Sequence, residues 1–278
     1  MLGNACKVWK LSITKGAVAL DLPDTSTLDM ITRQLPEGYY STFRTFDGCR
    51  RVLGLRTHLQ RIYQPAAVHK INPAVPITIL RSQIADILGD CPSEVRVRLV
   101  MTTRGEIYLA TTPLTALPSE VYQYGVKVMT TDMQRESPRV KSTAFIAASE
   151  NTRSQIAQSE VFEALLVRNN SILEGMTSNF FYVSDGVLGT ACKNILLGVT
   201  RRTVIRVARG SGLSIVYRAL KRELVPELSE AFLTSSSRGI VPIAQVDGIA
   251  VGEGTPGLIT KNLIDRYLTY VMQHAEIV

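Results

Sequence analysis

The sequence has few of the residues that build metal centres and disulfide frameworks. Its 278 residues include four cysteines, three histidines and one tryptophan. The cysteines form no C-x-x-C pair and the histidines are widely dispersed, so neither a zinc site nor a disulfide framework is indicated. These residues are Cys6, Cys49, Cys91 and Cys192, with His58, His69 and His274. We expect no metal, and thiols that are reduced and structural.

Long apolar runs are also missing. No stretch approaches the roughly 20 apolar residues that a membrane-spanning helix needs. The segment from Met1 to Lys15 mixes Asn, Lys and Trp with apolar residues, unlike the continuous apolar core of a signal peptide. A hydrophobic content of 45% with 20% charged residues is typical of a globular protein. We therefore expect a cytoplasmic protein without a membrane segment.

The net charge of +7 raises the question of nucleic acid. The basic residues are spread along the chain in small groups, and no run of them alternates with stacking aromatic residues. This pattern argues against nucleic acid as the main partner. A phosphate-bearing small molecule would use only a few of the arginines. A basic binding protein without enzymatic activity is the alternative to an enzyme.

The order of predicted elements indicates a mixed α/β fold with two domains. A strand over Tyr40–Phe46 turns at Asp47-Gly48 into a returning strand over Arg51–Leu55. A helix is predicted over Thr57–Gln64, and the alternation in Val95–Met101 predicts a half-exposed strand whose arginines face solvent. The segment 112–119, with two prolines among small residues, is the best linker. It divides the chain into a small N-terminal α/β domain, 1–115, and a larger C-terminal domain, 116–278.

The C-terminal domain is predicted to continue the alternation of strands and helices. Strands are expected over Gly125–Met129, Glu163–Val167, Phe180–Val183 and Ala231–Thr234, and helices over Ala144–Gln158, Thr200–Arg209 and Lys261–Met272.

Two residues in this domain carry the chemistry of a candidate site. Glu174 lies in the segment 173–181, between strand-like stretches, where a carboxylate is either in solvent or held inside for a purpose. Lys141 lies among apolar and small residues before a predicted helix. Burial beside cations such as Arg135 or Arg139 would lower its pKa and make it an amine nucleophile for a carbonyl.

Three further elements suit a phosphate. The sequence Gly198-Val199-Thr200-Arg201 opens a helix, where backbone N–H groups and the helix dipole favour an anion. Four hydroxyl residues, 234–237, follow a short apolar strand and include Ser235 and Ser236. Arg61 adds a fixed positive charge with bidentate geometry for phosphate oxygens. A Schiff-base lysine, a carboxylate for a ring nitrogen and a phosphate cup are the requirements of pyridoxal 5′-phosphate.

With these motifs in this order, the chain resembles the fold-type IV, or class IV, pyridoxal-phosphate enzymes. This family contains D-amino acid aminotransferases, branched-chain aminotransferases and aminodeoxychorismate lyases. The resemblance extends from about Tyr40 to Tyr270. Its segments are 40–48, 58–61, 141–142, 163–167, 173–179, 197–201, 232–237 and 247–257.

The resemblance implies a role for each candidate residue. Lys141 would form the Schiff base, Glu174 would bind the protonated ring nitrogen, and Tyr40 would lie at the substrate. The phosphate would be held by Arg61, Val199, Thr200, Ser235 and Ser236. The family also implies a homodimer, with an amino acid and a 2-oxo acid as the substrates of an aminotransferase.

The same resemblance leaves the substrate open. Branched-chain aminotransferases usually carry a tyrosine five residues after the lysine, where this chain has Ile146. D-amino acid enzymes use an Arg-x-His pair on a loop, and the corresponding stretch Thr103–Tyr108 has none. Thr42 falls where the lyases place a threonine. An aminotransferase is the main prediction, and an aminodeoxychorismate lyase, which releases 4-aminobenzoate and pyruvate, is the alternative.

Overall fold

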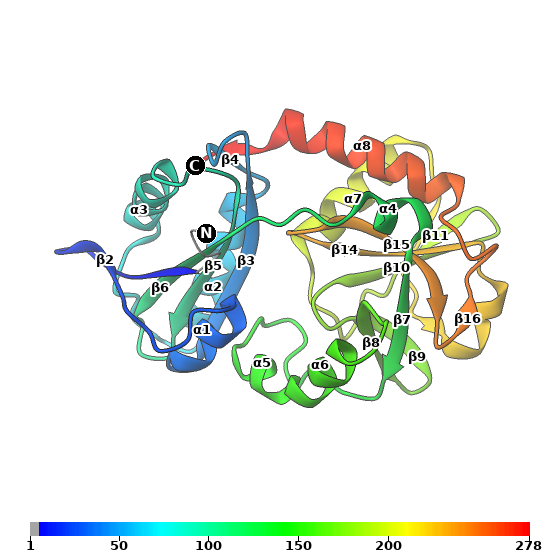
Figure 1. The fold of residues 1–278 in the computed structure, drawn as a ribbon, viewed down its shortest axis with the longest axis horizontal. Coiled ribbons are helices and arrows are strands. Elements are labelled where there is room, and N and C mark those ends of the chain that lie inside the picture. Colours follow the sequence, from blue (N-terminus) through cyan, green and yellow to red (C-terminus); the bar gives the residue numbers. More distant parts are fainter. Residues whose placement is uncertain (1–5) are drawn as a thin grey trace. The chain divides into compact units, whose positions relative to one another are not determined.

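The computed structural model describes residues 6–278 and divides them into two compact units (Figure 1). The first unit contains residues up to Thr115, with Val140–Ala148 and His274–Val278, and the second contains Ala116–Arg139 and Ser149–Gln273. The predicted domains, 1–115 and 116–278, differ from these units in two segments. The segment that carries Lys141 and the C-terminal end both belong to the first unit. Within the described residues no helix is long and apolar enough to cross a membrane.

The first unit is built on a seven-stranded sheet in the order β17-β4-β3-β5-β6-β1-β2. Its strands are β1 Lys7–Ser12, β2 Gly16–Ala19, β3 Gly38–Phe46, β4 Arg51–Val52, β5 Val95–Thr102, β6 Ile107–Pro113 and β17 Glu276–Ile277. Its helices are α1 Leu28–Gln34, α2 Leu55–Val68, α3 Ile77–Gly89 and α5 Ala144–Ala148. The mixed α/β class that the sequence predicts is confirmed.

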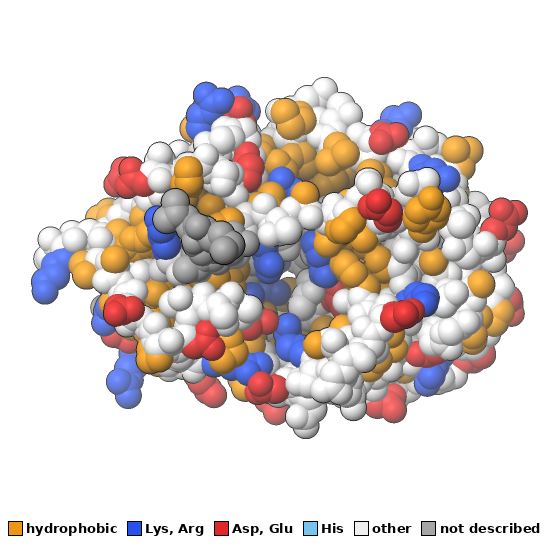
Figure 2. All heavy atoms as spheres, in the orientation of Figure 1, with side chains coloured by type: hydrophobic (Ala, Val, Ile, Leu, Met, Phe, Trp, Pro, Cys, Tyr) orange, Lys and Arg blue, Asp and Glu red, His pale blue; other side chains and the backbone are white. Residues whose placement is uncertain are grey.

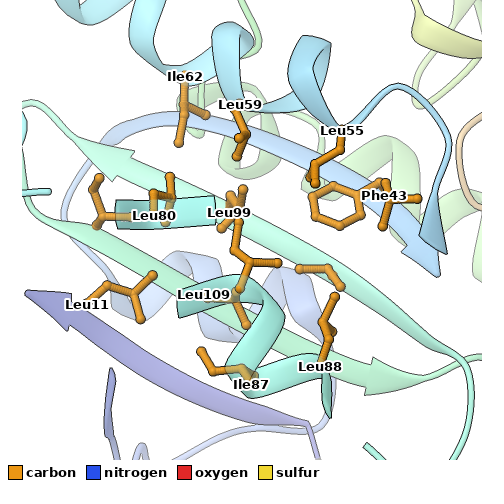
Figure 3. Packing of buried hydrophobic residues seen from close by; sticks show 14 of the residues in the cluster. Leu11, Phe43, Leu55, Leu59, Ile62, Leu80, Ile87, Leu88, Leu99 and Leu109 are labelled. Atoms are coloured by element: carbon orange, nitrogen blue, oxygen red, sulfur yellow. The ribbon is translucent and has the colours of Figure 1, made fainter. Parts of the chain in front are cut away.

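Side-chain alternation along the strands gives this sheet two buried faces. On one face, Leu99 of β5 and Leu109 of β6 pack with residues of α2 and α3, such as Leu59 and Leu80 (Figure 3). On the other face, Tyr40 pairs with Val100 and Thr42 with Arg98 across β3 and β5. This second face therefore carries Tyr40, which the sequence places at the substrate.

Three predicted element boundaries in or beside this unit were wrong. Leu55 begins a helix and does not end a strand, because Gly54 adopts φ 68 and starts α2 directly after β4. β6 extends to Pro113, into the predicted linker. The helix predicted over Ala144–Gln158 is two helices, α5 and α6 (Glu150–Ala157), because the backbone of Ser149 leaves the helical region at φ −88 and ψ 5.

The second unit contains a ten-stranded sheet whose central part closes on itself. The path β10-β14-β15-β7-β8-β9 is completed by a pairing of β9 with β10, in which Asn179 lies opposite Glu174. The strands are β7 Val126–Thr131, β8 Glu163–Arg168, β9 Ser171–Gly175, β10 Asn179–Ser184, β11 Val187–Gly189, β12 Ile215–Val216, β13 Leu220–Lys221, β14 Glu230–Ser235, β15 Gly239–Val246 and β16 Ile249–Ala250. Glu174 is thus located on the closing pair of strands.

Two long helices belong to this unit. α7 (Val199–Gly210) starts at Gly198, and α8 (Leu258–His274) starts beside the buried carboxylate of Glu230. Glu230 accepts hydrogen bonds from the backbone N–H groups of Ile259 and Thr260, which satisfies two donors of the first turn of α8. The remaining helices are α4 Ser119–Tyr124, α6 and the 3-10 helix Arg222–Glu227. The four cysteines of the chain are free thiols.

Candidate active site

Lys141 belongs to the first unit, where its segment is fixed along the edge of β3. The backbone N–H of Tyr40 donates to the carbonyl of Lys141 at 2.9 Å, and that of Thr143 donates to the carbonyl of Gly38 at 2.9 Å. The N–H of Gly38 also donates to the hydroxyl of Thr143 at 2.9 Å. These three bonds extend the sheet by a short segment and hold the lysine backbone beside Tyr40.

The ring of Tyr40 lies near two cations. The Nζ of Lys141 is 4.7 Å from the ring centroid, and the guanidinium carbon of Arg98 is 4.9 Å from it. At these distances both cations are attracted by the negative face of the ring. Tyr40 is buried, so the structure brings together the predicted lysine and the predicted substrate residue.

Arg98 is buried, which corrects the prediction that the arginines of this strand face solvent. Its Nη1 donates to Asp29 at 2.5 Å and to Thr32 at 3.0 Å, and its Nε donates to the hydroxyl of Thr42 at 3.1 Å. A buried guanidinium is tolerated only with such partners. Thr42, the residue that the lyase alternative draws on, is therefore an acceptor for Arg98.

Arg61 lies on α2 together with a fully buried histidine. The Nδ1 of His58 is 2.8 Å from the hydroxyl of Ser41, and its Nε2 has no hydrogen-bond partner among the described residues. Burial holds the pKa of His58 well below its usual value, and the positive charges of Arg61 and Lys141 lower this pKa further. His58 is therefore neutral near pH 7, and both predicted cations act on this one imidazole.

Glu174 lies in the second unit and is 2% exposed. Its Oε1 accepts a hydrogen bond from the Nε of Arg135 at 2.9 Å. Its Oε2 accepts from the side-chain amide of Asn179 at 3.2 Å and from the backbone N–H of Leu196 at 2.9 Å. A carboxylate with a guanidinium and two N–H donors is stabilised in its charged form. The solvated strand-end alternative for Glu174 is therefore wrong.

The structure gives defined partners to Arg135 and Arg139, the two cations that the sequence suggests beside Lys141. Arg135, expected beside Lys141, forms a buried salt bridge with Glu174 and also donates to the carbonyl of Met176 at 2.5 Å. Arg139 donates to the carbonyl of Cys192 at 2.7 Å. The ion pair of Arg135 with Glu174 thus joins two side chains that are both almost fully buried.

The start of α7 has the features of an anion site. The residue before the helix is Gly198, which has no side chain to cap the first turn. Its backbone N–H donates to the Oδ1 of Asn179 at 3.2 Å. A Cβ at position 198 would lie 2.2 Å from that oxygen, so a larger residue here would require Asn179 or the backbone to shift. Val199 and Thr200 follow as the first residues of the helix, where N–H groups point out of its end.

The hydroxyl segment after β14 lies beside this helix start. The hydroxyl of Thr200 is 3.5 Å from the hydroxyl of Ser236, at the outer limit of a hydrogen bond. Ser235 and Ser236 are half-buried, and Thr234 is buried with no partner for its hydroxyl among the described residues. The structure therefore brings together the two phosphate-binding elements that the sequence predicts in this unit.

The remaining predicted features concern the choice of substrate. Ile146 is buried in a cluster with Tyr40, Val100 and Tyr108. In the stretch Thr103–Tyr108 the chain makes a short turn into β6, with Gly105 at φ 83. An apolar residue thus packs against Tyr40 at the position where the branched-chain enzymes usually carry a tyrosine.

Sequence reasoning gave no role to three polar residues of the second unit. Asn179 joins Glu174 to the N–H of Gly198 through the two ends of its amide. The buried Glu163 and Arg238 form an ion pair at 2.8 Å, and the Nε of Arg238 donates to Ser235 at 3.1 Å. Asn179 and Glu163 lie inside segments that carry the family resemblance, so their positions in these segments could have indicated a role. Arg238 follows the serine run and belongs to no motif.

Basic and acidic side chains are interspersed over the face shown in Figure 2. This distribution agrees with the scattered basic residues of the sequence.

Each unit, taken by itself, contains groups of the kind that pyridoxal 5′-phosphate requires. Arg61 and Lys141 supply the positive charge of the first unit. The second unit supplies a buried carboxylate, the helix start after Gly198 and the hydroxyls of Thr200, Ser235 and Ser236. These groups match the ring nitrogen, the aldehyde and the phosphate of this cofactor in kind.

Comparisons with known proteins identify the class. The family described as amino-transferase class IV matches residues 38–246. The chain is 25% identical over 248 residues to D-alanine aminotransferase of Bacillus licheniformis, covering 83% of this chain and 86% of the relative. It is 28% identical over 233 residues to the branched-chain-amino-acid aminotransferase of Escherichia coli (strain K12), covering 75% of each.

The fold is shared with solved structures. A branched-chain amino acid aminotransferase of T.th., solved with pyridoxamine 5′-phosphate, superposes with a TM-score of 0.81 at 21% identity, covering 97% of this chain and 95% of that one. The branched-chain enzyme of Escherichia coli gives a TM-score of 0.80 at 22% identity, covering 98% and 96%.

The chain belongs to the class IV aminotransferases, and its cofactor is therefore pyridoxal 5′-phosphate. Membership of this family confirms that the protein is an enzyme and sets aside the alternative of a non-enzymatic binding protein.

Proposed function

We propose that this enzyme transfers an amino group between an amino acid and a 2-oxo acid, with Lys141 as the residue that binds the cofactor as a Schiff base. The observation that carries the proposal is the buried Glu174, whose charged form is favoured by Arg135 and two N–H donors. Such a carboxylate suits a protonated ring nitrogen. When bound, the cofactor supplies an electron sink for the bond that breaks at the substrate Cα.

Each residue has a defined task in this proposal. Glu174 holds a proton at the ring nitrogen, and the Nζ of Lys141 moves a proton to and from the substrate Cα. The face of Tyr40 supports the Nζ of Lys141 beside the substrate. The phosphate is bound by a larger set, and several contacts fix the cofactor against rotation. This set is Arg61, Val199, Thr200, Ser235 and Ser236.

The amino donor is D-alanine or a branched-chain amino acid, the two classes named for the relatives. Neither class is favoured by the residues that usually mark it, because Ile146 replaces the tyrosine and Thr103–Tyr108 has no Arg-x-His. The donor can be identified by adding D-alanine, L-alanine, L-valine or L-leucine, one at a time and without a 2-oxo acid, while recording the visible absorption of the bound cofactor. We expect one class to convert the band. A protein that carries the band but converts it with no amino acid would contradict the proposal.

The lyase alternative is one outcome of the same experiment. A lyase would release 4-aminobenzoate and pyruvate from aminodeoxychorismate and leave the absorption band unchanged after turnover. Thr42, the residue that suggests the lyase reaction, accepts a hydrogen bond from Arg98. This contact does not favour the lyase over the aminotransferase.

A homodimer and a cytoplasmic location are further parts of the proposal; the homodimer rests on the resemblance to the family, and the location is the expectation drawn from the sequence. Light scattering at several protein concentrations tests the assembly. A mass of twice 30.6 kDa is expected, and a monomer at every concentration would contradict it.

A further inference from the structure

Arg238 lies in the tight connection between β14 and β15. Ser235, the last residue of β14, pairs with Gly239, the first residue of β15, so three residues form the loop. Gly239 has φ 69, as expected for the left-handed position that closes a three-residue hairpin. The loop is therefore short and its backbone is well defined, which places Arg238 three residues after Ser235 on the same turn.

Two nitrogens of the Arg238 guanidinium have defined partners. Its Nε donates to the hydroxyl oxygen of Ser235 at 3.1 Å. Its Nη2 donates to the Oε2 of Glu163 at 2.8 Å and to the hydroxyl of Thr177 at 2.7 Å. The guanidinium carbon also lies 4.9 Å from the ring centroid of Phe162. Hydrogen bonds and ring packing thus fix the direction of the Nε–H bond.

Glu163, the counter-ion of Arg238, is itself rigidly held. Its side chain is 4% exposed, and its Oε1 accepts from the N–H of Thr177 at 2.5 Å and from the hydroxyl of Ser178 at 3.1 Å. A Cβ at Gly175 would lie 2.8 Å from this oxygen, so the segment that carries Glu174 packs closely on Glu163. The positive charge of Arg238 is therefore neutralised by a carboxylate whose orientation is fixed by its hydrogen bonds.

This arrangement determines what the hydroxyl of Ser235 can do. A serine hydroxyl has one proton to donate and lone pairs that accept, whereas a guanidinium only donates. Because Arg238 occupies a lone pair of Ser235, the hydroxyl proton has to point away from Arg238. A donor that already accepts a hydrogen bond is polarised and donates more strongly to an anion.

We propose that Arg238 is a positioning residue of the phosphate site, which orients the hydroxyl of Ser235 as a donor to the phosphate and makes no contact with the phosphate itself. The inference rests on the proposed phosphate role of Ser235. It adds to that role an ion pair, Arg238 with Glu163, that connects the serine segment to the segment of Glu174.

A double-mutant cycle on the cofactor-free protein tests the inference. The four proteins are the wild type, Arg238→Met, Ser235→Ala and the double variant. The ligands are pyridoxamine 5′-phosphate and pyridoxamine, measured by calorimetry. These two ligands differ only in the phosphate, and neither forms a Schiff base with a lysine, so the ratio of their dissociation constants reports the phosphate contacts alone.

We expect each single variant to weaken binding of pyridoxamine 5′-phosphate by about tenfold, the effect of one lost hydrogen bond. Binding of pyridoxamine should change by less than about twofold. Since Arg238 acts through Ser235, the double variant should bind pyridoxamine 5′-phosphate no more weakly than either single variant. If the two residues made independent contacts, their effects would multiply, and the double variant would bind about a hundredfold more weakly than the wild type.

Arg238→Gln is the matched control, because the side-chain amide of glutamine can donate to Ser235 without a charge. Recovery of most of the affinity by this variant supports orientation through the hydrogen bond. The melting temperature of each cofactor-free variant shows that it is folded, and if Arg238→Met does not fold, the cycle is carried out with Arg238→Lys, which lacks the Nε–H donor.

Three results would overturn the inference. A hundredfold loss of affinity for pyridoxamine 5′-phosphate in the double variant would mean that Arg238 contacts the phosphate directly. If Arg238→Met weakened binding of pyridoxamine as much as binding of pyridoxamine 5′-phosphate, Arg238 would support the site as a whole and not the phosphate contacts. A wild-type protein that binds pyridoxamine 5′-phosphate no better than pyridoxamine would instead refute the proposed phosphate site, and the inference with it.

Discussion

Asn179 lies directly opposite Glu174 in the pair of strands that closes the sheet of the second unit, and its amide donates to that carboxylate at 3.2 Å. The same amide accepts from the N–H of Gly198 at 3.2 Å and donates to the carbonyl of Leu196 at 2.7 Å. Opposed residues in antiparallel strands point to the same side of the sheet. One side chain therefore couples the predicted ring-nitrogen carboxylate to the start of α7.

Removal of the guanidinium beside Glu174 should destabilise the protein strongly. Arg135→Met leaves a carboxylate buried without its counter-ion, and we expect a loss of about 3–5 kcal/mol in the free energy of unfolding. Denaturant unfolding of the cofactor-free protein measures this loss. Addition of Glu174→Gln should restore much of the stability, because the unpaired charge is then gone. If the double variant is as unstable as Arg135→Met, the ion pair is not the cause.

Glu174→Gln alone separates the chemical role from the structural one. Glutamine keeps the shape of the side chain but carries no negative charge for a protonated ring nitrogen. We expect the variant to bind the cofactor and to react with the amino donor about 10- to 100-fold more slowly in a single turnover. An unchanged rate would show that the charge of Glu174 is not used.

Gly198→Ala should reduce binding of the phosphate. The added Cβ would lie 2.2 Å from the Oδ1 of Asn179, so either this amide or the loop before α7 has to shift, and the N–H of Gly198 loses its acceptor. We expect binding of pyridoxamine 5′-phosphate to weaken by at least about tenfold, while pyridoxamine binds as before. Gly210→Ala is the matched control, because its Cβ would have no neighbour within 4 Å.

His58 should make the protein less stable in mild acid. Its pKa in the unfolded chain is near the ordinary 6.5, and in the folded protein burial holds it well below that value. Between the two values the unfolded chain binds more protons. The stability that depends on a neutral His58 should therefore be fully present above about pH 6.5. Below that pH the free energy of unfolding should decrease, by up to about 1.4 kcal/mol per pH unit.

His58→Gln removes this titration and keeps a polar group next to Ser41. Unfolding of both proteins in urea between pH 5 and 8 gives the difference between them as a function of pH. A difference that does not change with pH would contradict the assignment of a low pKa to His58.

Much of the site could be predicted from short motifs because each acts locally. Gly198 and Thr200 define a helix start through the two or three residues around them, and Glu174 lies in a segment of small residues that closes a strand pair. Motifs of this kind depend on backbone geometry near each residue, which the neighbouring sequence determines.

The missed residues have partners that are distant in the sequence. Arg135 pairs with Glu174, 39 residues away, and Arg98 with Asp29, 69 residues away. The alternation of Val95–Met101 resembles a half-exposed strand, but α1, which sequence reasoning did not predict, supplies Asp29 and Thr32 as partners of the buried Arg98. Arg238 is comparable, since it lies in a loop and its partner Glu163 lies on β8, 75 residues away.

The most direct test of the central claim is to locate the cofactor on the chain. The protein with bound pyridoxal 5′-phosphate is reduced with borohydride, digested, and analysed by mass spectrometry for the phosphopyridoxyl group. We predict a single modified residue, Lys141, and loss of the modification and of the visible absorption band in Lys141→Ala. A modification at another lysine, or a band that persists in Lys141→Ala, would contradict the account.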